Sequence, residues 1–359
     1  MRYANRLIAG WVLTTLVVAA GCVTAPPTEQ GAGTGGGANK TGPVRIGFSM
    51  DTLKEERWQR DKELFEAHAK ELGAQVFTEV ANGDDSQQVN QADNLLTRGI
   101  DVLVVVPHNG EIAASIVNKA KAAGVPVISY DRLIKNSDVD LYVSHQVEKI
   151  GEMQAQYALD KVPKGNYVLI GGAPTDNNAL LLRVGQKRIL DPAVARGDIK
   201  IVADPMARDW LPVEALKHTE NALTQNSNNV QAIVSSNDGT AGGAIQALES
   251  QRLVGKVVVT GQDADLAACQ RVVEGRQSMT IYKPIKPLAY SAVENAVKLA
   301  RGEKPATSTT VNNGKIDVPA ILEEPISVDA NNMATTVIKD GFWKTEDVYK
   351  NVPRDKWPK

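Results

Sequence analysis

From residue 44 onward, short apolar runs rich in β-branched residues alternate with longer stretches whose apolar residues recur at helical spacing. The run 102–106 is apolar throughout, as expected of a strand buried on both faces of a parallel sheet. The predicted strands are 44–49, 75–80, 102–106, 125–130, 167–170, 200–203, 232–235, 257–260 and 279–282. The clearest predicted helices are 56–72, 111–123, 213–224 and 288–301. This alternation predicts right-handed βαβ crossovers and parallel sheets covered on both faces.

The alternation breaks once, at 142–151, and a second set of strand–helix units begins at Asn166. The chain is also longer than one hydrophobic core usually organises. We therefore predict an α/β fold of two doubly wound parallel-sheet lobes joined by a hinge. Pro284 and the turn at 302–305 indicate a return crossing, and 312–319 indicates another. The predicted lobes are 44–145 plus about 284–318, and about 146–283 plus 319–345.

The N-terminus has the pattern of a signal peptide over residues 1–21. Arg2 and Arg6 precede an uncharged apolar run, and small residues then lead to Cys22. The run is too short to serve comfortably as a spanning helix. It resembles a bacterial lipoprotein signal, in which cleavage occurs before Cys22 and a diacylglyceryl group is attached to the sulfur. An ordinary N-terminal helix with a buried cysteine is the alternative.

Residues 22–43 are rich in Gly, Thr, Ala and Pro and contain almost no large apolar side chain. Such a segment cannot bury enough surface to fold, and it predicts a flexible tether with a reach on the order of 25 Å. With a lipid on Cys22, the protein would be held at the outer face of the cytoplasmic membrane or in the periplasm. Its contact with the membrane would be through the lipid anchor only.

Composition and motifs narrow the function further. The formal charge of -2 gives no long-range field for nucleic acid. With Cys22 lipidated, Cys269 has no disulfide partner, and its apolar surroundings predict a core position. The four histidines lack metal-ligand spacing, Gly171-Gly172 lacks the rest of a phosphate or dinucleotide motif, and no nucleophile elbow occurs. We expect no enzyme activity, no metal and no cofactor, and we expect a monomer.

Side chains suited to binding a sugar follow the predicted strands of both lobes. Ligands of open parallel sheets bind outside the carboxyl ends of the strands, which places these side chains in the cleft between the lobes. Carboxyl, amide, guanidinium and ammonium groups can satisfy hydroxyls that both donate and accept, and indole rings can pack on the C–H faces of a pyranose. The set is Arg57, Trp58, Asp131, Arg132, Asp176, Asn178, Trp210, Asn237, Asp263 and Lys283, with Asn177 and Asp238 beside them.

Each member of this set has a simpler explanation when it is taken alone. An Asp-Arg pair after a strand is often a surface ion pair or a helix cap, and a tryptophan is often a core residue. Asn237 and Asp238 could simply cap the helix that follows them. The recurrence of such groups at equivalent strand ends favours a binding site.

Several longer segments carry a family resemblance. They are 56–59 (ERWQ), 130–132 (YDR), 176–179 (DNNA), 236–248 (SNDGTAGGAIQAL), 261–265 (GQDAD) and 282–285 (YKPI). From residue 44 to about 343 the chain resembles the periplasmic D-xylose-binding proteins, which belong to the ribose-type sugar-binding group that feeds ATP-driven importers. The resemblance implies the type I periplasmic binding protein fold. It implies that Trp58 and Trp210 sandwich the sugar ring while the other eight candidate residues hydrogen-bond the sugar. One departure is His145-Gln146-Val147, where the family usually has a Phe-Asp-Asn-like segment near the hinge.

The sequence therefore predicts an exported, lipid-anchored protein whose lobes close on one monosaccharide, D-xylose above others, and deliver it to the permease of an ABC importer. A sugar-sensing input to a membrane kinase or chemoreceptor, and a broader xylose and glucose binder, are the alternatives. A sugar-responsive repressor would need an N-terminal helix-turn-helix, and residues 1–43 do not supply one. An oxidoreductase would need a glycine-rich dinucleotide fingerprint after a strand, and the strand ends do not show one. For His145 we expect a solvated hinge position rather than a pH-sensitive latch.

Overall fold

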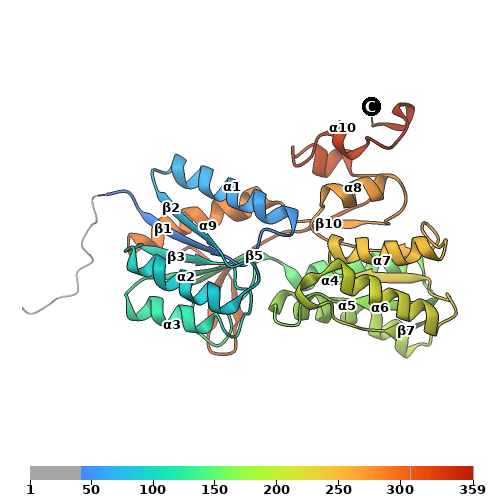
Figure 1. The fold of residues 1–359 in the computed structure, drawn as a ribbon, viewed down its shortest axis with the longest axis horizontal. Coiled ribbons are helices and arrows are strands. Elements are labelled where there is room, and N and C mark those ends of the chain that lie inside the picture. The colour runs from blue at the N-terminus through green and yellow to red at the C-terminus, as the bar shows by residue number, and fades with distance from the viewer. Residues whose placement is uncertain (1–41, 308, 359) are drawn as a thin grey trace, which may run out of the picture. The chain divides into compact units, whose positions relative to one another are not determined.

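The computed structural model describes residues 42–307 and 309–358, which form two α/β lobes (Figure 1). The predicted signal peptide, Cys22 and all but the last two residues of the predicted tether lie outside these ranges. The first lobe has a seven-stranded sheet in the order β11-β12-β5-β4-β3-β1-β2. Its strands are β1 (Arg45–Met50), β2 (Gln75–Val80), β3 (Val102–Val105), β4 (Val127–Tyr130), β5 (Leu141–His145), β11 (Thr309–Asn312) and β12 (Asp317–Glu323). Neighbouring strands are parallel except in the β11–β12 hairpin.

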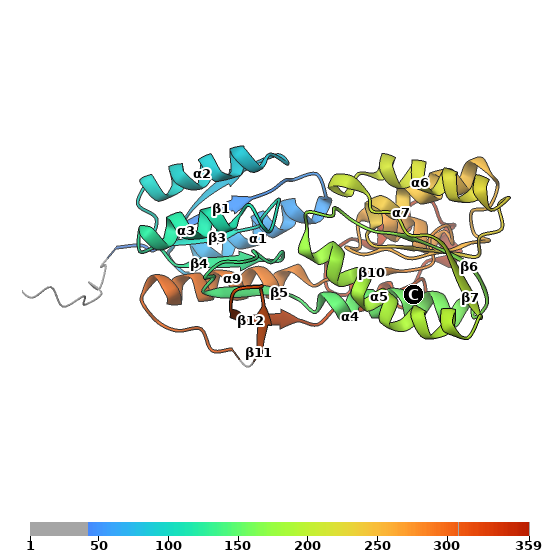
Figure 2. The same cartoon turned by 90° about the horizontal axis from the view of Figure 1, so that it is seen from below.

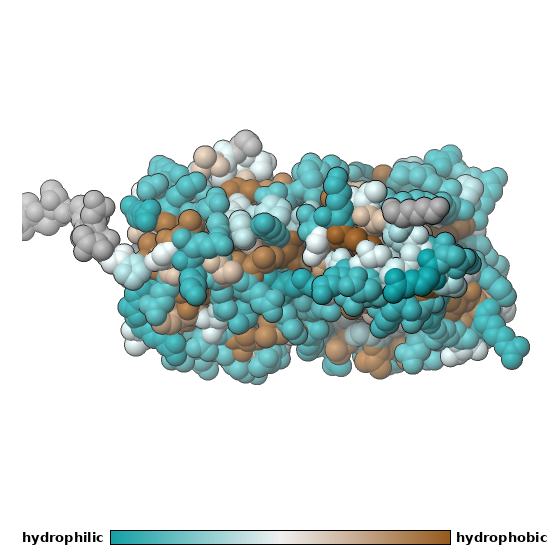
Figure 3. Space-filling view, turned by 90° about the horizontal axis from the view of Figure 1, so that it is seen from above, coloured by the Kyte–Doolittle hydropathy of each residue, from teal (hydrophilic) through white to brown (hydrophobic). Residues whose placement is uncertain are grey.

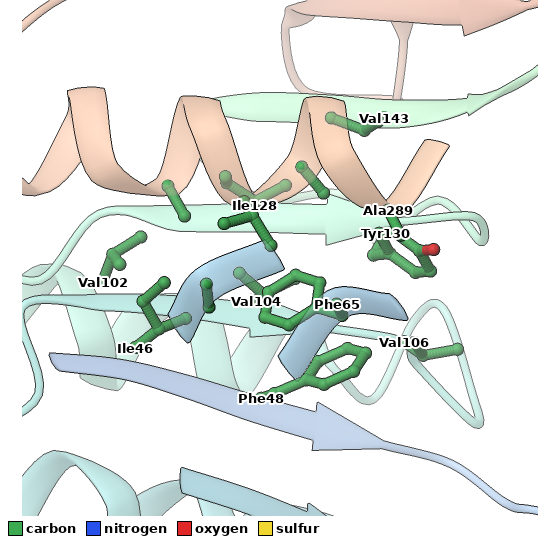
Figure 4. Packing of buried hydrophobic residues seen from close by; sticks show 14 of the residues in the cluster. Ile46, Phe48, Phe65, Val102, Val104, Val106, Ile128, Tyr130, Val143 and Ala289 are labelled. Carbon is green, nitrogen blue, oxygen red and sulfur yellow. The ribbon is translucent and has the colours of Figure 1, made fainter. Parts of the chain in front are cut away.

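Helices cover both faces of this sheet because successive strand residues point to opposite sides. Phe48 of β1 faces α1 (Glu56–Glu71) and α9 (Ile285–Ala300), and its ring stacks on Phe65 with centroids 4.3 Å apart (Figure 4). Gly47 faces the opposite layer of α2 (Asp85–Thr97) and α3 (Ala114–Ala122), where a Cβ would come within 2.6 Å of Ile100 Cδ1. The alternation along β1 thus divides the core of this lobe into two apolar layers.

The second lobe has a parallel sheet in the order β7-β6-β8-β9 and a separate antiparallel pair, β10–β13. The strands are β6 (Gly165–Ile170), β7 (Ile199–Ala203), β8 (Ala232–Ser235), β9 (Val258–Val259), β10 (Thr280–Tyr282) and β13 (Ile326–Val328). The helices are α4 (Val147–Lys161), α5 (Asn177–Ala195), α6 (Pro212–Gln225), α7 (Asp238–Ser250) and α8 (Leu266–Val273). Helices α4 and α5 pack closely enough that a Cβ on Gly185 would lie 2.0 Å from the Glu148 carbonyl oxygen. Glycine at that position therefore sets the spacing of the two helices.

The predicted elements of the βαβ units all form. The nine predicted strands differ from the observed ones by at most two residues at either end, and the four helices by at most three. The segment 142–151 contains β5 and the start of α4 rather than an irregular break. The polar residues at the end of β5, Ser144 and His145, are buried, which hid the strand from a reading based on apolar runs.

The chain crosses between the sheets after β5, after β10 and after β12 (Figure 2). The sequence predicts a return crossing at 312–319, whereas in the structure these residues belong to a hairpin of the first lobe. Residues 309–323 form the β11–β12 hairpin, and β12 pairs with β5 from Ala320 to Glu323. The first lobe therefore extends to Glu323 instead of about residue 318, because the register with β5 carries the strand onward.

After β13 the chain forms a C-terminal segment, 329–358, which packs on α8. It contains a π-helical turn (Ala334–Ile338), α10 (Thr345–Val348) and a 3-10 turn (Arg354–Lys356). On the face drawn in Figure 3 the surface is mostly hydrophilic, with apolar residues showing in small separate areas. Within 42–307 and 309–358, no helix combines the length and the apolar character needed to cross a membrane.

Candidate ligand-binding site

All ten predicted binding residues line one pocket of about 330 Å³, together with Glu55 and Gln262. First-lobe residues come from the start of α1 and from the end of β4. Second-lobe residues come from the start of α5, a 3-10 turn at Arg208–Trp210, the start of α7 and the ends of β9 and β10. The carboxyl ends of the strands of both lobes therefore converge on this space, as the sequence pattern predicted.

Arg57 sits at the centre of a buried charge network. Its Nη1 lies 2.8 Å from Asp131 Oδ2 and 3.8 Å from Asp263 Oδ1, and its Nε lies 3.0 Å from Asp61 Oδ2. Lys283 Nζ lies 3.0 Å from Asp263 Oδ1 and 3.8 Å from Asp131 Oδ2. The network joins α1 and β4 of the first lobe to the strand ends of the second.

The charges of this network decide the ionisation of Asp131. Burial alone would raise the pKa of its carboxyl, but Arg57 and then Lys283 outweigh burial and hold the pKa below its ordinary value. Burial likewise would lower the pKa of Arg57, while Asp131 and Asp61 raise it well above the ordinary value. The pocket therefore presents an ionised carboxylate and a guanidinium, each able to hydrogen-bond a hydroxyl.

A second chain of contacts crosses from the first lobe to an indole of the second. Arg132 Nη1 lies 2.6 Å from Asp51 Oδ2, and Arg132 Nε lies 2.9 Å from Asp176 Oδ2. Trp210 donates its Nε1–H to the same Asp176 oxygen over 3.2 Å. His108 Nδ1 lies 2.9 Å from Asp51 Oδ1, and that hydrogen bond raises the pKa of the imidazole although burial opposes it. This chain holds Arg132, Asp176 and Trp210 in fixed positions at the pocket.

The two tryptophans are nearly buried and still reach the pocket. Trp58 is 3% exposed and donates its Nε1–H to Glu55 Oε2 over 2.9 Å, while Trp210 is 8% exposed. Gly172 makes room for the second indole, because a Cβ there would lie 2.1 Å from Trp210 Cη2. Trp210 has a φ of 57°, a left-handed conformation that bulky residues rarely adopt. The indole is therefore placed at some backbone cost, which suits a functional position.

Second-lobe polar residues also begin helices: the helix-cap alternative is correct for Asn237, and Asp176 is a helix cap as well. Asp176 accepts from the Asn178 amide over 2.9 Å, and Asn237 accepts from the Thr240 amide over 2.9 Å in a capping box. Both residues nevertheless line the pocket. Asn178 donates from Nδ2 to the Asp131 carbonyl oxygen over 3.0 Å, which links the lobes.

Asp238, which stands beside Asn237, does not line the pocket. Its carboxylate accepts from Gln277 Nε2, from Thr280 Oγ1 and from the Asp265 amide. Burial raises the pKa of this carboxyl to about 7. Asp238 therefore supports the loop that carries Gln262 and Asp263, and it does not face a ligand.

His145 is not solvated, so that prediction was wrong. The side chain is 1% exposed, and its Nε2 lies 3.2 Å from the Pro284 carbonyl oxygen at the neighbouring crossing. Burial, and then the charge of Lys283, lowers the pKa of the imidazole to about 3. The ring is neutral near pH 7, and Nε2–H is the donor to Pro284. The packing of two crossings against each other buries it, which the residues around it in the sequence did not indicate.

Glu55 and Gln262 are the pocket residues that the sequence analysis missed. Glu55 directly precedes the segment 56–59, and Gln262 lies within the segment 261–265, beside Asp263. Burial raises the pKa of the Glu55 carboxyl. In the described part of the chain, no group of three His, Cys, Asp or Glu residues could hold a metal ion.

Comparison with known proteins gives the family. The family model of the periplasmic binding protein domain matches residues 46–304, so the chain belongs to that family. The D-xylose-binding periplasmic protein of Haemophilus influenzae is 53% identical over 306 residues, which cover 85% of this chain and 92% of that protein. The Escherichia coli protein of the same name is 51% identical over 305 residues, with 85% and 92% covered. Both are named as binding proteins and not as enzymes.

A solved structure shows the same architecture. The carbohydrate transporter solute binding protein from Chloroflexus aurantiacus, in complex with D-glucose, is 32% identical and superposes with a TM-score of 0.80, covering 86% of this chain and 98% of that one. The predicted type I periplasmic binding protein fold, with its two parallel-sheet lobes, is thereby confirmed.

Proposed function

We propose that this periplasmic binding protein captures D-xylose between its two lobes and delivers it to an ABC importer. One observation carries the proposal: the ten residues selected from strand ends as suited to a sugar line a single buried pocket. About half of the aligned residues are identical in the two relatives named for D-xylose, and this supports the choice of sugar.

The chemistry of the pocket suits a pyranose. Asp131 and Asp263 accept hydrogen bonds from hydroxyls, and Arg57, Arg132 and Lys283 donate to them. The amide groups of Asn178 and Asn237 can do both. Trp58 and Trp210 supply flat apolar faces for the C–H groups of the ring, from the first and the second lobe respectively.

Closure of the lobes supplies the mechanism. The Arg132–Asp176 ion pair and the Asn178 bond to Asp131 both join one lobe to the other at the pocket wall. A sugar held by both lobes can make its full set of contacts only when they are closed, so binding shifts the population toward the closed form. The permease would then recognise that form, with the binding protein acting as a monomer.

The location follows from the N-terminal pattern and from the relatives. We infer that the chain is exported, cleaved before Cys22 and held by a lipid at the outer face of the cytoplasmic membrane or in the periplasm. Both D-xylose-binding relatives are named periplasmic, which supports export. Radiolabelled fatty acid incorporated by the wild type and not by Cys22→Ser would support the anchor, and equal labelling of both would contradict it.

A broader specificity that includes glucose is the second candidate. The Chloroflexus relative is in complex with D-glucose. A second, small space shares Glu55, Arg132 and Trp210 with the pocket and has other polar lining residues, among them Lys54 and Asp209. Enlargement of this space would make room for the hydroxymethyl group by which glucose exceeds xylose. One added group usually changes affinity by only about 1–3 kcal/mol.

Calorimetric titration of the purified protein with D-xylose, D-glucose, D-ribose and L-arabinose tests these proposals. One-to-one binding of D-xylose, with much weaker binding of glucose, is the expected result. Lys283→Met should weaken binding, whereas Lys315→Met removes an exposed lysine, paired with Asp138 over 2.7 Å, and should not. Comparable affinity for glucose would favour the broader binder. No response to any pentose or hexose would contradict the sugar assignment.

A further inference from the structure

Trp343 of the C-terminal segment touches both the first lobe and the loop that carries Asp263. Its indole Nε1–H donates to the Ala264 carbonyl oxygen over 2.7 Å. Above its ring lies the guanidinium of Arg60, with Cζ 4.1 Å from the ring centroid. Phe342, the neighbour of Trp343, also lies under Arg60, with Cζ 5.0 Å from the centroid of its ring. Arg60 belongs to α1 of the first lobe, whereas the segment packs on α8 of the second (Figure 1). Trp343 lies outside the pocket lining.

The Ala264 carbonyl belongs to a turn whose backbone conformation is energetically unfavourable for residues other than glycine. Asp263 has a φ of 100° and Ala264 a φ of 53°, and both are in the region that favours glycine. The Asp263 amide donates to the Ile281 carbonyl oxygen over 2.8 Å, and the Ala264 amide donates to Thr280 Oγ1 over 3.2 Å.

The Ala264 carbonyl oxygen accepts from two side chains. The indole of Trp343 is the stronger donor, because the Cys269 thiol, at 3.3 Å, is a weak one. Loss of the indole donor would leave the Ala264 carbonyl oxygen with the thiol alone. The turn would be weakened at this end and still be held by the Asp265 amide, which donates to Asp238 Oδ2 over 3.1 Å.

The same contact region bridges the lobes. Arg57, Arg60 and Leu64 share one face of α1, at helical spacings of three and four residues. Arg57 lines the pocket, Arg60 covers Trp343, and Leu64 packs against the apolar cluster of the C-terminal segment. Glu56 Oε2 adds a bond from the Leu266 amide over 2.9 Å. These contacts join the two lobes in the form that the structure describes.

We propose that Trp343 is a positioning residue for the sugar site: it fixes the Asp263–Ala264 turn through its indole N–H and, through Arg60, strengthens the closed form. The proposal rests on the proposed sugar-binding function. Loss of one partly buried hydrogen bond to the loop that carries Asp263 corresponds to about a tenfold change in affinity. Because the Arg60 contact belongs to the closed form, its loss should appear mainly in the dissociation rate.

The chain offers a matched control in the same segment. Trp357 donates its Nε1–H to the Val352 carbonyl oxygen over 2.8 Å and lies under Arg354, with Cζ 4.0 Å from the ring centroid. These are the same two interactions, made within the C-terminal segment. Trp343→Phe and Trp357→Phe in the full-length protein therefore remove equivalent donors while keeping an aromatic ring.

Calorimetry and stopped-flow dissociation of D-xylose test the proposal. Trp343→Phe should raise Kd about tenfold, with most of the change in the dissociation rate, and Trp357→Phe should stay within about twofold of the wild type. Arg60→Met should raise the dissociation rate as well. Unchanged affinity in Trp343→Phe, or an equal loss in the Trp357 control, would overturn the proposal.

A second measurement needs no sugar. Amide hydrogen exchange of residues 261–266 should be faster in Trp343→Phe than in the wild type, and unchanged in Trp357→Phe and Arg60→Met. If the wild type binds none of the sugars, the proposed function fails, and exchange still decides whether Trp343 holds the turn. Equal exchange at 261–266 in Trp343→Phe and the wild type would refute that part.

Discussion

Arg132 of the first lobe and Asp176 of the second are joined by an ion pair of 2.9 Å between Nε and Oδ2, and the same carboxylate oxygen accepts the indole N–H of Trp210. A guanidinium, a carboxylate and an aromatic ring from different lobes thus form one unit at the pocket wall. Any change to one member alters the position of the others.

Trp210→Ala should remove most of the affinity for D-xylose, by about 100-fold or more, because it deletes an apolar face and leaves Asp176 without one donor. Calorimetry measures the affinity, and circular dichroism checks that the fold is kept. Trp357→Ala, a truncation in the C-terminal segment, is the matched control and should bind normally. Normal binding by Trp210→Ala, or loss of its folded spectrum, would contradict the assigned role.

Asp131→Asn should both weaken sugar binding and destabilise the protein. The substitution removes the carboxylate 2.8 Å from Arg57, while Asp61 and Asp263 remain beside the cations of the network. Loss of a hydrogen bond to a charged group costs about 1.5–3 kcal/mol. Urea denaturation measures the free energy of unfolding. Asp138→Asn removes an exposed carboxylate 2.7 Å from Lys315, and a change within about 0.5 kcal/mol is expected there. Equal effects of the two substitutions would show that the Asp131 network contributes no more than a surface pair.

His145→Gln should reduce the loss of stability on acidification. The folded protein keeps the imidazole neutral because burial lowers its pKa to about 3, whereas the unfolded chain protonates it near pH 6.5. Below about pH 6.5 the unfolded state therefore binds more protons, and stability falls with pH by up to about 1.4 kcal/mol per unit. Urea titrations between pH 7 and 4 should show a shallower decline for the variant. Parallel declines would contradict a buried neutral His145.

His108→Gln should change how stability depends on pH above about pH 6.5 rather than below it. The hydrogen bond to Asp51 raises the pKa of His108 in the folded state, so its contribution is complete below the unfolded pKa of about 6.5 and is lost as pH rises through the folded value. Asp85 and Arg132 also act on this ring, and Lys54 lines the same space as His108. The wild type should lose stability as the pH rises above about 6.5, and the variant should lose less. A slope that persists in the variant would assign the effect to another group.

The sequence by itself determined the regular βαβ units and ten of the twelve residues that line the pocket. A strand such as 102–106 is apolar at each position because both faces are buried, so it can be predicted from its own residues. Parallel topology then brings the strand ends together, and residues as distant as Arg57 and Lys283 meet without any local signal of their meeting. The ten predicted residues share one pocket for that reason.

Tertiary structure decided what depends on contacts between distant segments. Strand β12 belongs to the first lobe because it pairs with β5, and His145 is buried because two crossings pack together. Trp343 meets Ala264 across 79 residues and Arg60 across a much longer stretch of chain. Apolar periodicity reports which face of an element is buried and not which partner buries it, so these contacts had to come from the folded structure.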